Sequence, residues 1–434
     1  MKKYVVTNNA EFEVIERRIS GAAGDGASDA ILEEKLAATR AVVEAVRTRG
    51  DAALAEFTEK FDKAKLDPKH FEVTPAEIDA ALGAVESKVL QALERAHANI
   101  SEFHRKNLRQ SWEEKSSDGS ILGQRLTPIE SVGLYVPGGT AFYPSSVLMN
   151  IVPARVAGVR DIVMVSPPSY KGGVHPLVLA AAKIAGASRV FRVGGAQAIA
   201  ALAYGTKTIP NVLKIAGPGN IYVTLAKRLV SGICDIDKEA GPSEVVVIAD
   251  DEADPRQVAL ELLAQAEHDE DARAMLVALS DPFVERVMQA VEHEIKTLPR
   301  AGIVRKALDA QGGAYVVRTI DEAARLTNLI APEHLSIQTE NPRAVFDRIQ
   351  NAGCAVLGGG TSVAVGDYYA GPNHILPTGR RARFSSPLTA DDFRKVTSII
   401  SFSRERMAQV ADDVMALANA EQLQAHARAI EIRR

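Results

Sequence analysis

A carboxylate and an imidazole stand side by side at Glu333 and His334, directly after Pro332. Such a pair can donate and accept protons near neutral pH. A helix usually ends before proline, and residues 335–339 alternate like a strand. We therefore expect the pair on a short connection at the edge of a sheet, where α/β proteins carry their chemistry. On this stretch alone, a surface pair on a loop is the simpler interpretation.

Gln265 and His268 are three residues apart at the end of a predicted helix that opens at Asp254 and Pro255. Positions three apart share a helix face, so both side chains point the same way. The imidazole could bind a metal ion and the amide oxygen could add to it. Because glutamine is an uncommon zinc ligand, a hydrogen-bonded surface histidine remains the alternative.

Two further candidate pairs lie nearer the C-terminus. Asp367 and His374 fall in a polar loop, and such loops often carry function; Asp367 could offer a carboxylate oxygen to a cation. Glu421 and His426 lie on the predicted C-terminal helix, roughly 140° apart on an ideal helix. They can serve one site only if that helix ends or bends, or if a ligand spans both directions.

Glycine-rich turns follow predicted strands at residues 137–139, 194–197 and 217–220. Such turns let backbone amides approach an anion and often lead into a helix N-terminus. No Gly-x-Gly-x-x-Gly occurs at a strand-to-helix turn, so the ordinary dinucleotide fingerprint is missing. Tight turns of a parallel sheet and a cofactor site both remain open.

The bulk composition is that of a water-soluble globular protein, and 434 residues predict two or more domains. A formal net charge of −4 and few aromatic residues give no case for nucleic acid or an anionic membrane. We expect no membrane span, no secretory signal and a cytoplasmic location. Cys234 and Cys354 do not make a disulfide framework.

The N-terminal part reads as helical. Thr74 and Glu77 form a capping box before a predicted amphipathic helix over residues 75–108, with His97 and His104 expected at its surface. Residues 112–126 predict a hairpin that turns at Asp118-Gly119.

From residue 131 onward, short apolar strands alternate with helices, and the alternation starts again at Glu244. Strands that are apolar throughout indicate a parallel sheet covered on both faces, so we predict a doubly wound α/β fold. Two successive units suggest an internal duplication, without a clear residue-level repeat. The chain ends in a predicted helix over residues 404–432.

Taken together, these stretches resemble the histidinol dehydrogenase family, which carries out the last two steps of histidine biosynthesis. The resemblance runs from about Thr74 to Arg434. It is clearest in GLYVPGG at 133–139, GGAQAIAA at 194–201, GPGN at 217–220, AGPSE at 240–244, AQAEH at 264–268, APEHLS at 331–336, GDYYAGPNHILP at 366–377 and AHAR at 425–428.

The resemblance implies roles for the individual residues. One zinc ion per subunit would be held by Gln265, His268 and Asp367, with His426 supplied by the partner subunit of a homodimer with shared active sites. The zinc would grip the imidazole and amino nitrogens of L-histidinol. The substrate site would comprise Ser243, Gln265, His268, His334, Asp367, His374, Glu421 and His426, and NAD would contact Tyr135, Gln197 and Asn220.

The same resemblance assigns the chemistry. His334 would take the hydroxyl proton as hydride leaves, and Glu333 would activate a water to attack the bound aldehyde, so that a second hydride reaches a second NAD. The implied architecture is two successive incomplete Rossmann-like doubly wound domains. They would comprise residues 25–134 with 243–388, and residues 135–242, flanked by an N-terminal segment at 1–24 and a helical tail at 389–434 that swaps onto the partner.

Two alternatives remain. A related zinc- and NAD-dependent dehydrogenase of another small polyfunctional alcohol would keep Glu333 and His334 but alter the groups that recognise the amine and imidazole. Glu421 and His374 favour histidinol. A non-catalytic metal- or nucleotide-binding protein would be expected to lose Glu333 or His334, and both are present. The arginine-rich segment from Arg380 to Arg383 receives no role.

Overall fold

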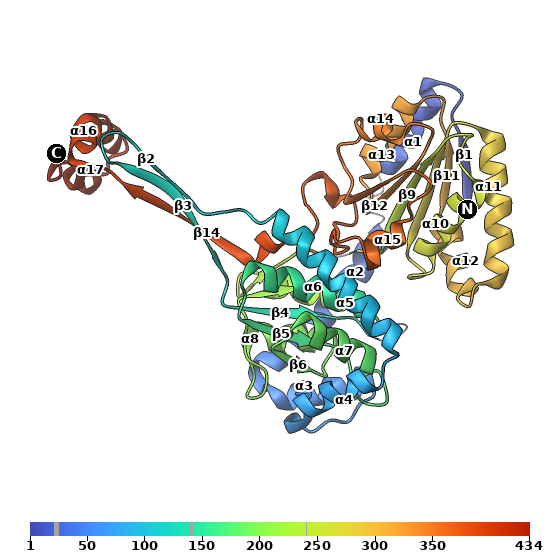
Figure 1. Cartoon of the computed structure of the whole chain (residues 1–434), viewed down its shortest axis with the longest axis horizontal. Coiled ribbons are helices and arrows are strands. Elements are labelled where there is room, and N and C mark those ends of the chain that lie inside the picture. Colours follow the sequence, from blue (N-terminus) through green and yellow to red (C-terminus); the bar gives the residue numbers. More distant parts are fainter. Residues whose placement is uncertain (21–25, 139–141, 240) are drawn as a thin grey trace.

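The computed structural model describes residues 1–20, 26–138, 142–239 and 241–434. Two parallel sheets lie side by side, and a thin antiparallel arm leads away from them to the C-terminal helices (Figure 1). The expected boundary between residues 24 and 25, and Gly139 and Ala240 of the quoted motifs, lie outside the described residues. None of the described helices has the length and apolarity needed to cross a membrane.

The first parallel sheet has five short strands in the order β6-β5-β4-β7-β8. Apolar side chains of the sheet contact α4, α5, α6 and α7 on one face and α2, α3, α8 and α9 on the other, as the apolar strands predicted. The strands are β4 (Ser131–Tyr135), β5 (Asp161–Val165), β6 (Arg189–Phe191), β7 (Lys214–Ala216) and β8 (Asp235–Ile236). The helices are α2 (Gly26–Arg49), α3 (Asp51–Asp62), α4 (Pro75–Gly83), α5 (Ser87–Lys106), α6 (Pro144–Ala157), α7 (Pro176–Ala185), α8 (Gly195–Tyr204) and α9 (Ile221–Val230), with the short η1 (Pro68–His70).

The second parallel sheet has six strands in the order β1-β11-β10-β9-β12-β13. One of its faces packs on α10, α11 and α12, and the other on α1 and α13. The strands are β1 (Lys2–Val5), β9 (Glu244–Ala249), β10 (Arg273–Ala278), β11 (Gly313–Val316), β12 (His334–Gln338) and β13 (Cys354–Leu357). The helices are α1 (Asn9–Ser20), α10 (Pro255–Ala266), α11 (Asp281–Glu294), η2 (Ile295–Thr297), α12 (Ala301–Ala310), α13 (Ile320–Ile330), α14 (Pro342–Phe346) and α15 (Val363–Tyr368).

Different segments of the N-terminal part pack on or pair with each of the two sheets. The helices α2 to α5, which the resemblance groups with residues 243–388, pack on the five-stranded sheet: α2 on α8 and α9, α4 on α7, and α5 on α6 and α7. Strand β1 pairs with β11 and so adds an edge strand to the six-stranded sheet. The division of the chain into domains stays a prediction.

The arm is an antiparallel sheet in the order β14-β3-β2. The predicted hairpin is confirmed as β2 (Trp112–Lys115) and β3 (Ile121–Pro128), with Gly119 at a φ of 86° in the turn. Strand β14 (Arg394–Ser401) was not expected; it follows η3 (Arg381–Arg383) and η4 (Ala390–Phe393). The single predicted tail helix is wrong: α16 (Arg404–Ala420) and α17 (Gln424–Glu431) are separated at Gln422, which has a φ of 60°.

The predicted helix over residues 75–108 is two helices, although the Thr74–Glu77 capping box that opens it is confirmed. The surface position expected for His104 is wrong, because its side chain is buried at 1% exposure, while His97 is half-buried. His104 follows Ile100 by four residues on α5 and therefore lies on the same apolar face.

Candidate active site

The Glu333–His334 pair is placed by the connection from α13 to β12. Helix α13 ends at Ile330, before Pro332 as predicted, and β12 begins at His334, one residue earlier than expected. Parallel pairing sets His334 beside Val245 of β9. The backbone amide of Glu244 then donates a hydrogen bond of 2.8 Å to Oε2 of Glu333.

Burial governs the protonation of the Glu333 carboxyl, which is 7% exposed. Its pKa is raised well above the ordinary value, first by burial and then by the nearby negative charges of Glu244 and Asp367, although the hydrogen bond from the Glu244 amide opposes the rise. A carboxyl with so little solvent is a stronger base once it is ionised.

His334 faces Asp367, with 3.7 Å between Nε2 and Oδ1. Burial, together with the neighbouring His374 and His268, lowers the pKa of His334 to about 3, so the imidazole is neutral at physiological pH. Burial and then Glu261 raise the pKa of Asp367 to about 7. Among the described residues, the group within ion-pair distance of the Asp367 carboxylate is His334, which is neutral, so this half-buried carboxyl has no fixed cation.

His374 is fixed by hydrogen bonds at both ring nitrogens. Nδ1 lies 2.9 Å from the carbonyl oxygen of Asp367, and a carbonyl can only accept, so Nδ1 carries the proton. Nε2 is then an acceptor in the neutral ring, and the hydroxyl of Ser146 donates to it over 3.3 Å. Burial lowers the pKa of His374 to about 4, which keeps the ring neutral.

Gln265 and His268 flank the end of α10 rather than sharing a helix face, because α10 ends at Ala266. The expectation of a common helix face is therefore wrong for His268. The two residues are still joined by a backbone hydrogen bond of 3.2 Å from the amide of His268 to the carbonyl of Gln265. Gln265 is buried and His268 half-buried, and burial lowers the pKa of His268, which favours the neutral, metal-binding form.

Within the described chain, no three His, Cys, Asp or Glu side chains are grouped so that they could hold a metal ion. Of the three zinc ligands expected from one chain, only His268 and Asp367 are of these types, and Gln265 is an amide. The donors nevertheless have the chemistry that zinc accepts: a neutral imidazole, an amide oxygen and a half-buried carboxylate that lacks a fixed cation. A fourth ligand has to come from elsewhere.

Three site residues were missed by the sequence analysis. Glu261 accepts a hydrogen bond of 3.1 Å from the amide of Val363 and so holds the start of α15, which carries Asp367. Ser146 is hydrogen-bonded to His374, and Glu244 lies beside Glu333. Glu261 could have been found, because it lies one helical turn before Gln265. Ser243, expected at the substrate, lies just before Glu244 and is half-buried.

The residues expected at NAD lie at the carboxyl ends of the five-stranded sheet. Tyr135 ends β4, and its hydroxyl accepts a hydrogen bond of 3.2 Å from the amide of Gly195; burial raises its pKa to about 12. Asn220 follows β7 and caps α9 by accepting from the amides of Tyr222 and Val223. The strand order changes direction between β4 and β7, the position where open α/β sheets bind ligands.

Gln197 lies near the start of α8 and only 1% of the residue is exposed; Tyr135 is also buried. The amide of Gln197 donates to Oδ2 of Asp62 over 3.3 Å, while its Oε1 is buried without a partner among the described atoms. Burial raises the pKa of Asp62 to about 6. Asp62 is a fourth residue that no motif indicated, since it ends α3, 135 residues before Gln197.

The structure does not bring Glu421 and His426 to the other site residues of the same chain. Glu421 caps the end of α16 and His426 lies in α17, and both are exposed. These helices sit at the far end of the arm from β12 and α15 (Figure 1). The break at Gln422 removes the objection that both residues share one continuous helix.

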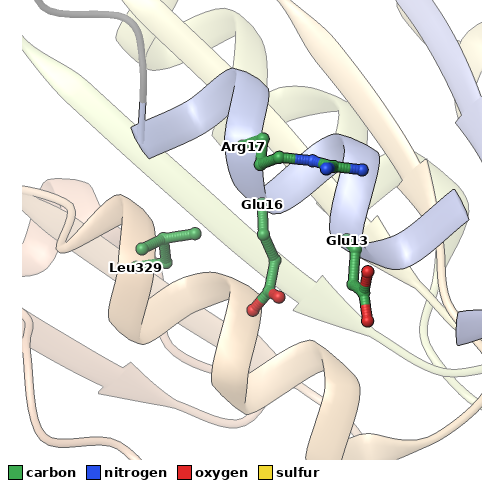
Figure 2. Close-up of a pocket in the computed structure, with 4 residues that line it drawn as sticks. All are labelled: Glu13, Glu16, Arg17 and Leu329. Carbon is green, nitrogen blue, oxygen red and sulfur yellow. The ribbon is translucent and has the colours of Figure 1, made fainter. Parts of the chain in front are cut away.

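A separate open hollow of about 300 Å³ lies between α1 and α13. Glu13, Glu16, Arg17 and Leu329 line it (Figure 2), and Glu16 is paired with Arg325 at 2.6 Å. None of the candidate site residues lines this hollow.

A family model, sequence relatives and a solved structure all match nearly the whole chain and all belong to one family. The family model described as Histidinol dehydrogenase matches residues 28–434. A histidinol dehydrogenase of Geobacillus kaustophilus is 51% identical over 92% of this chain and 94% of the relative, and one of a Synechococcus species is 47% identical over 99% and 98%. The crystal structure of histidinol dehydrogenase from Elizabethkingia anophelis superposes with a TM-score of 0.91 at 35% identity, covering 100% of this chain and 98% of that one.

Proposed function

The chain belongs to the histidinol dehydrogenase family and is an oxidoreductase of histidine biosynthesis, and on that premise we propose a zinc- and NAD-dependent, four-electron oxidation of L-histidinol to L-histidine through bound histidinaldehyde. The observation that carries the proposal is the convergence of Glu333 and His334, which are buried, with Asp367 and His374, which are half-buried, in one cluster.

His334 is the base of the first oxidation. Its ring is neutral at physiological pH, so one nitrogen is free to take the hydroxyl proton of histidinol as the carbinol hydride departs. A pKa of about 3 makes a weak base, so this role requires the pKa of His334 to rise toward neutrality in the loaded site. The 3.7 Å gap to Asp367 is too long for a hydrogen bond, so Nε2 is not engaged by that carboxylate. NAD, when bound, supplies the hydride acceptor for each of the two oxidations.

Glu333 activates the water of the second oxidation. Its Oε2 accepts from the amide of Glu244, which leaves Oε1 to orient and deprotonate a water beside the aldehyde carbon. The carboxyl must ionise for this role, and the positive charge of a bound amine or metal lowers its pKa toward the working range. The adjacency of Glu333 and His334 lets one connection serve both steps.

Gln265, His268 and Asp367 would hold the zinc, with His426 of a second subunit as the fourth ligand. When bound, zinc would supply a Lewis acid that fixes the substrate nitrogens. His374 is hydrogen-bonded to Ser146 and to the Asp367 carbonyl and so keeps a fixed orientation for substrate contact. Ser243 precedes β9 at the sheet edge where β12 begins with His334.

Dimerisation explains how the tail contributes. Glu421 and His426 are exposed at the end of an arm that leads away from their own sheets, so a second copy of the chain is the site they can reach (Figure 1). We propose a homodimer in which each tail completes the site of the partner, with Glu421 contacting the cationic amine.

Two Rossmann-like domains and a cytoplasmic location are parts of the same proposal.

NAD would bind at the carboxyl ends of β4 and β7. Asn220 is exposed there and can contact it directly. Tyr135 and Gln197 are buried, so contact through either side chain requires a local rearrangement when the cofactor enters.

The test is the number of NADH molecules formed per L-histidinol consumed, with a chelator and with zinc added back. Two NADH, lost on chelation and restored by zinc, is the expected result. One NADH would remove the second oxidation assigned to Glu333. No NADH from a zinc-replete dimer would move the assignment to a related dehydrogenase, and a screen of other amino alcohols would follow.

A further inference from the structure

A buried ion pair lies beneath the turn that leads into α9. Lys227 lies on α9 and Asp237 directly follows β8; Nζ of Lys227 contacts Oδ1 of Asp237. Their side chains are 2% and 1% exposed, among the most buried charges in the described chain. Neither residue belongs to the site assigned above.

Both members of the pair bind the same glycine. Oδ2 of Asp237 accepts a hydrogen bond of 2.9 Å from the amide of Gly217, and Nζ of Lys227 donates one of 3.0 Å to the carbonyl of Gly217. The pair therefore fixes the peptide groups on both sides of one residue. Gly217 has a φ of 114°, and a β-carbon there would lie 2.2 Å from the carbonyl oxygen of Tyr135.

The clamped turn is the entry to the proposed cofactor site. It runs from the end of β7 to Asn220, the N-cap of α9, and Gly217 crosses the backbone of Tyr135 at the end of β4. The positive end of a helix dipole attracts a phosphate even though Asn220 already accepts from the amides of Tyr222 and Val223, so the position of this N-terminus relative to β4 decides how well the pyrophosphate is held. Lys227 lies two turns further along α9 and ties the helix to its own entry turn.

Stability alone does not account for this pair. The desolvation of two buried charges offsets most of their attraction, and apolar residues of similar volume often replace such a pair without loss of stability. A fixed geometry is what apolar residues cannot supply, because they make no hydrogen bonds to the Gly217 peptide groups. We propose that Lys227 and Asp237 are positioning residues for NAD, whose ion pair sets the Gly217 turn and thereby the N-terminus of α9. The inference rests on the proposed use of NAD.

Lys238, the residue after Asp237, indicates whether removal of the pair would affect binding of NAD or of histidinol. Lys238 donates to the carbonyl of Ile375, next to His374, and also to the carbonyl of Ser386. These bonds do not involve Lys227 or Asp237, whose opposite charges act on Lys238 in opposite senses: Asp237 raises its pKa and Lys227 lowers it. Removing both charges together therefore leaves the support of the substrate loop in place. The effect is therefore expected on the cofactor and not on histidinol.

The test compares the wild-type protein with the double variant Lys227→Met/Asp237→Leu, which removes both charges and leaves neither unpaired. The matched control is Lys214→Met: Lys214 is also a buried lysine of this sheet, paired with Asp235 and bonded to the Asp392 carbonyl, but it does not contact the turn. Measurements are the thermal unfolding midpoint, the Kd for NADH by fluorescence titration, and separate KM values for NAD and histidinol.

We expect the Kd for NADH and the KM for NAD to rise about tenfold in the double variant, the scale of couplings carried through packed neighbours. The KM for histidinol should stay within about twofold, and the control should leave NADH binding unchanged. A folded double variant with a wild-type Kd for NADH overturns the inference alone. A wild-type protein that oxidises histidinol but binds no NADH overturns both the inference and the proposed use of NAD.

Discussion

Nε2 of His334 and Oδ1 of Asp367 lie 3.7 Å apart in a buried space where no Lys or Arg of the described residues pairs with the carboxylate. In the absence of a ligand, the pKa values of the two groups are shifted in opposite directions. Burial lowers the pKa of His334 to about 3 and raises that of Asp367 to about 7, so both charges are disfavoured. The arrangement is therefore suited to receive a cation on Asp367 while His334 stays a neutral base.

The substitution His334→Asn should reduce turnover by roughly 10²–10⁴-fold, the contribution of a general base. Histidinol binding should persist within a few fold, because the proposed zinc ligands and His374 are unchanged. Steady-state kinetics with calorimetric titration of histidinol would separate the two effects. His97→Asn, a half-buried histidine on α5, is the matched control. Unchanged turnover would remove His334 from the mechanism.

Glu333→Gln should uncouple the two oxidations. Glutamine can still accept the hydrogen bond from the Glu244 amide, but it cannot deprotonate water. The first hydride transfer depends on His334 and should continue, so NADH per histidinol should fall from two toward one. Trapping of an aldehyde by a hydrazine reagent would identify the stalled species. If two NADH still form, the water is activated by another group.

The sequence anticipated elements whose boundaries depend on local chemistry. Pro332 marked the end of α13, and Asp254 with Pro255 marked the start of α10, because caps and prolines act within a few residues. Strand β14 was missed for a tertiary reason. It pairs with β3, more than 260 residues earlier, and its side chains are mostly exposed, so no periodic apolar pattern reveals it.

The candidate site likewise contains residues that local sequence motifs indicated and residues that only tertiary contacts reveal. The motifs named Glu333, His334, Asp367 and His374, and the structure groups them. Glu261 and Ser146 act through contacts to Val363 and His374 that only the folded chain creates.

Removal of metal should lower stability as well as activity. A ligand present at 100 times its Kd stabilises the folded state by about 2.7 kcal/mol, so chelation should lower the unfolding midpoint and zinc should restore it. The variant Asp367→Asn lacks the proposed carboxylate ligand, and its midpoint should respond much less to chelator and zinc. Equal responses of the variant and the wild type would exclude Asp367 from the metal site.

Shared sites predict complementation between inactive proteins. His334→Asn damages the body of a site, and His426→Ala damages the tail that is proposed to enter the partner's site. Random exchange of subunits places half of the chains in mixed dimers, each with one intact site, so roughly a quarter of wild-type activity should return. Mixing two preparations of His334→Asn is the control. Absence of rescue after exchange, confirmed by mass spectrometry of tagged subunits, would mean that each chain builds its own site.

His104 should make the folded state sensitive to acid. Its ring is 1% exposed, edge-on to Phe103, and neither nitrogen has a hydrogen-bond partner among the described atoms. Burial lowers its pKa to about 4 from 6.5, although the nearby Asp392 opposes the shift. Between these values the unfolded chain binds more protons than the folded one, so this stability is present above pH 6.5 and is lost as the pH falls toward 4.

Replacement of the ring by leucine should remove this acid sensitivity, because leucine does not titrate and the ring nitrogens lose no partner. From pH 7.5 to pH 5, the loss of unfolding free energy measured with urea should be smaller in His104→Leu than in the wild type by about 2 kcal/mol. His70→Leu, which replaces an exposed histidine of η1, is the control for the substitution itself. An equal loss in the His104 variant and the wild type would show that the buried ring is protonated without cost to the fold.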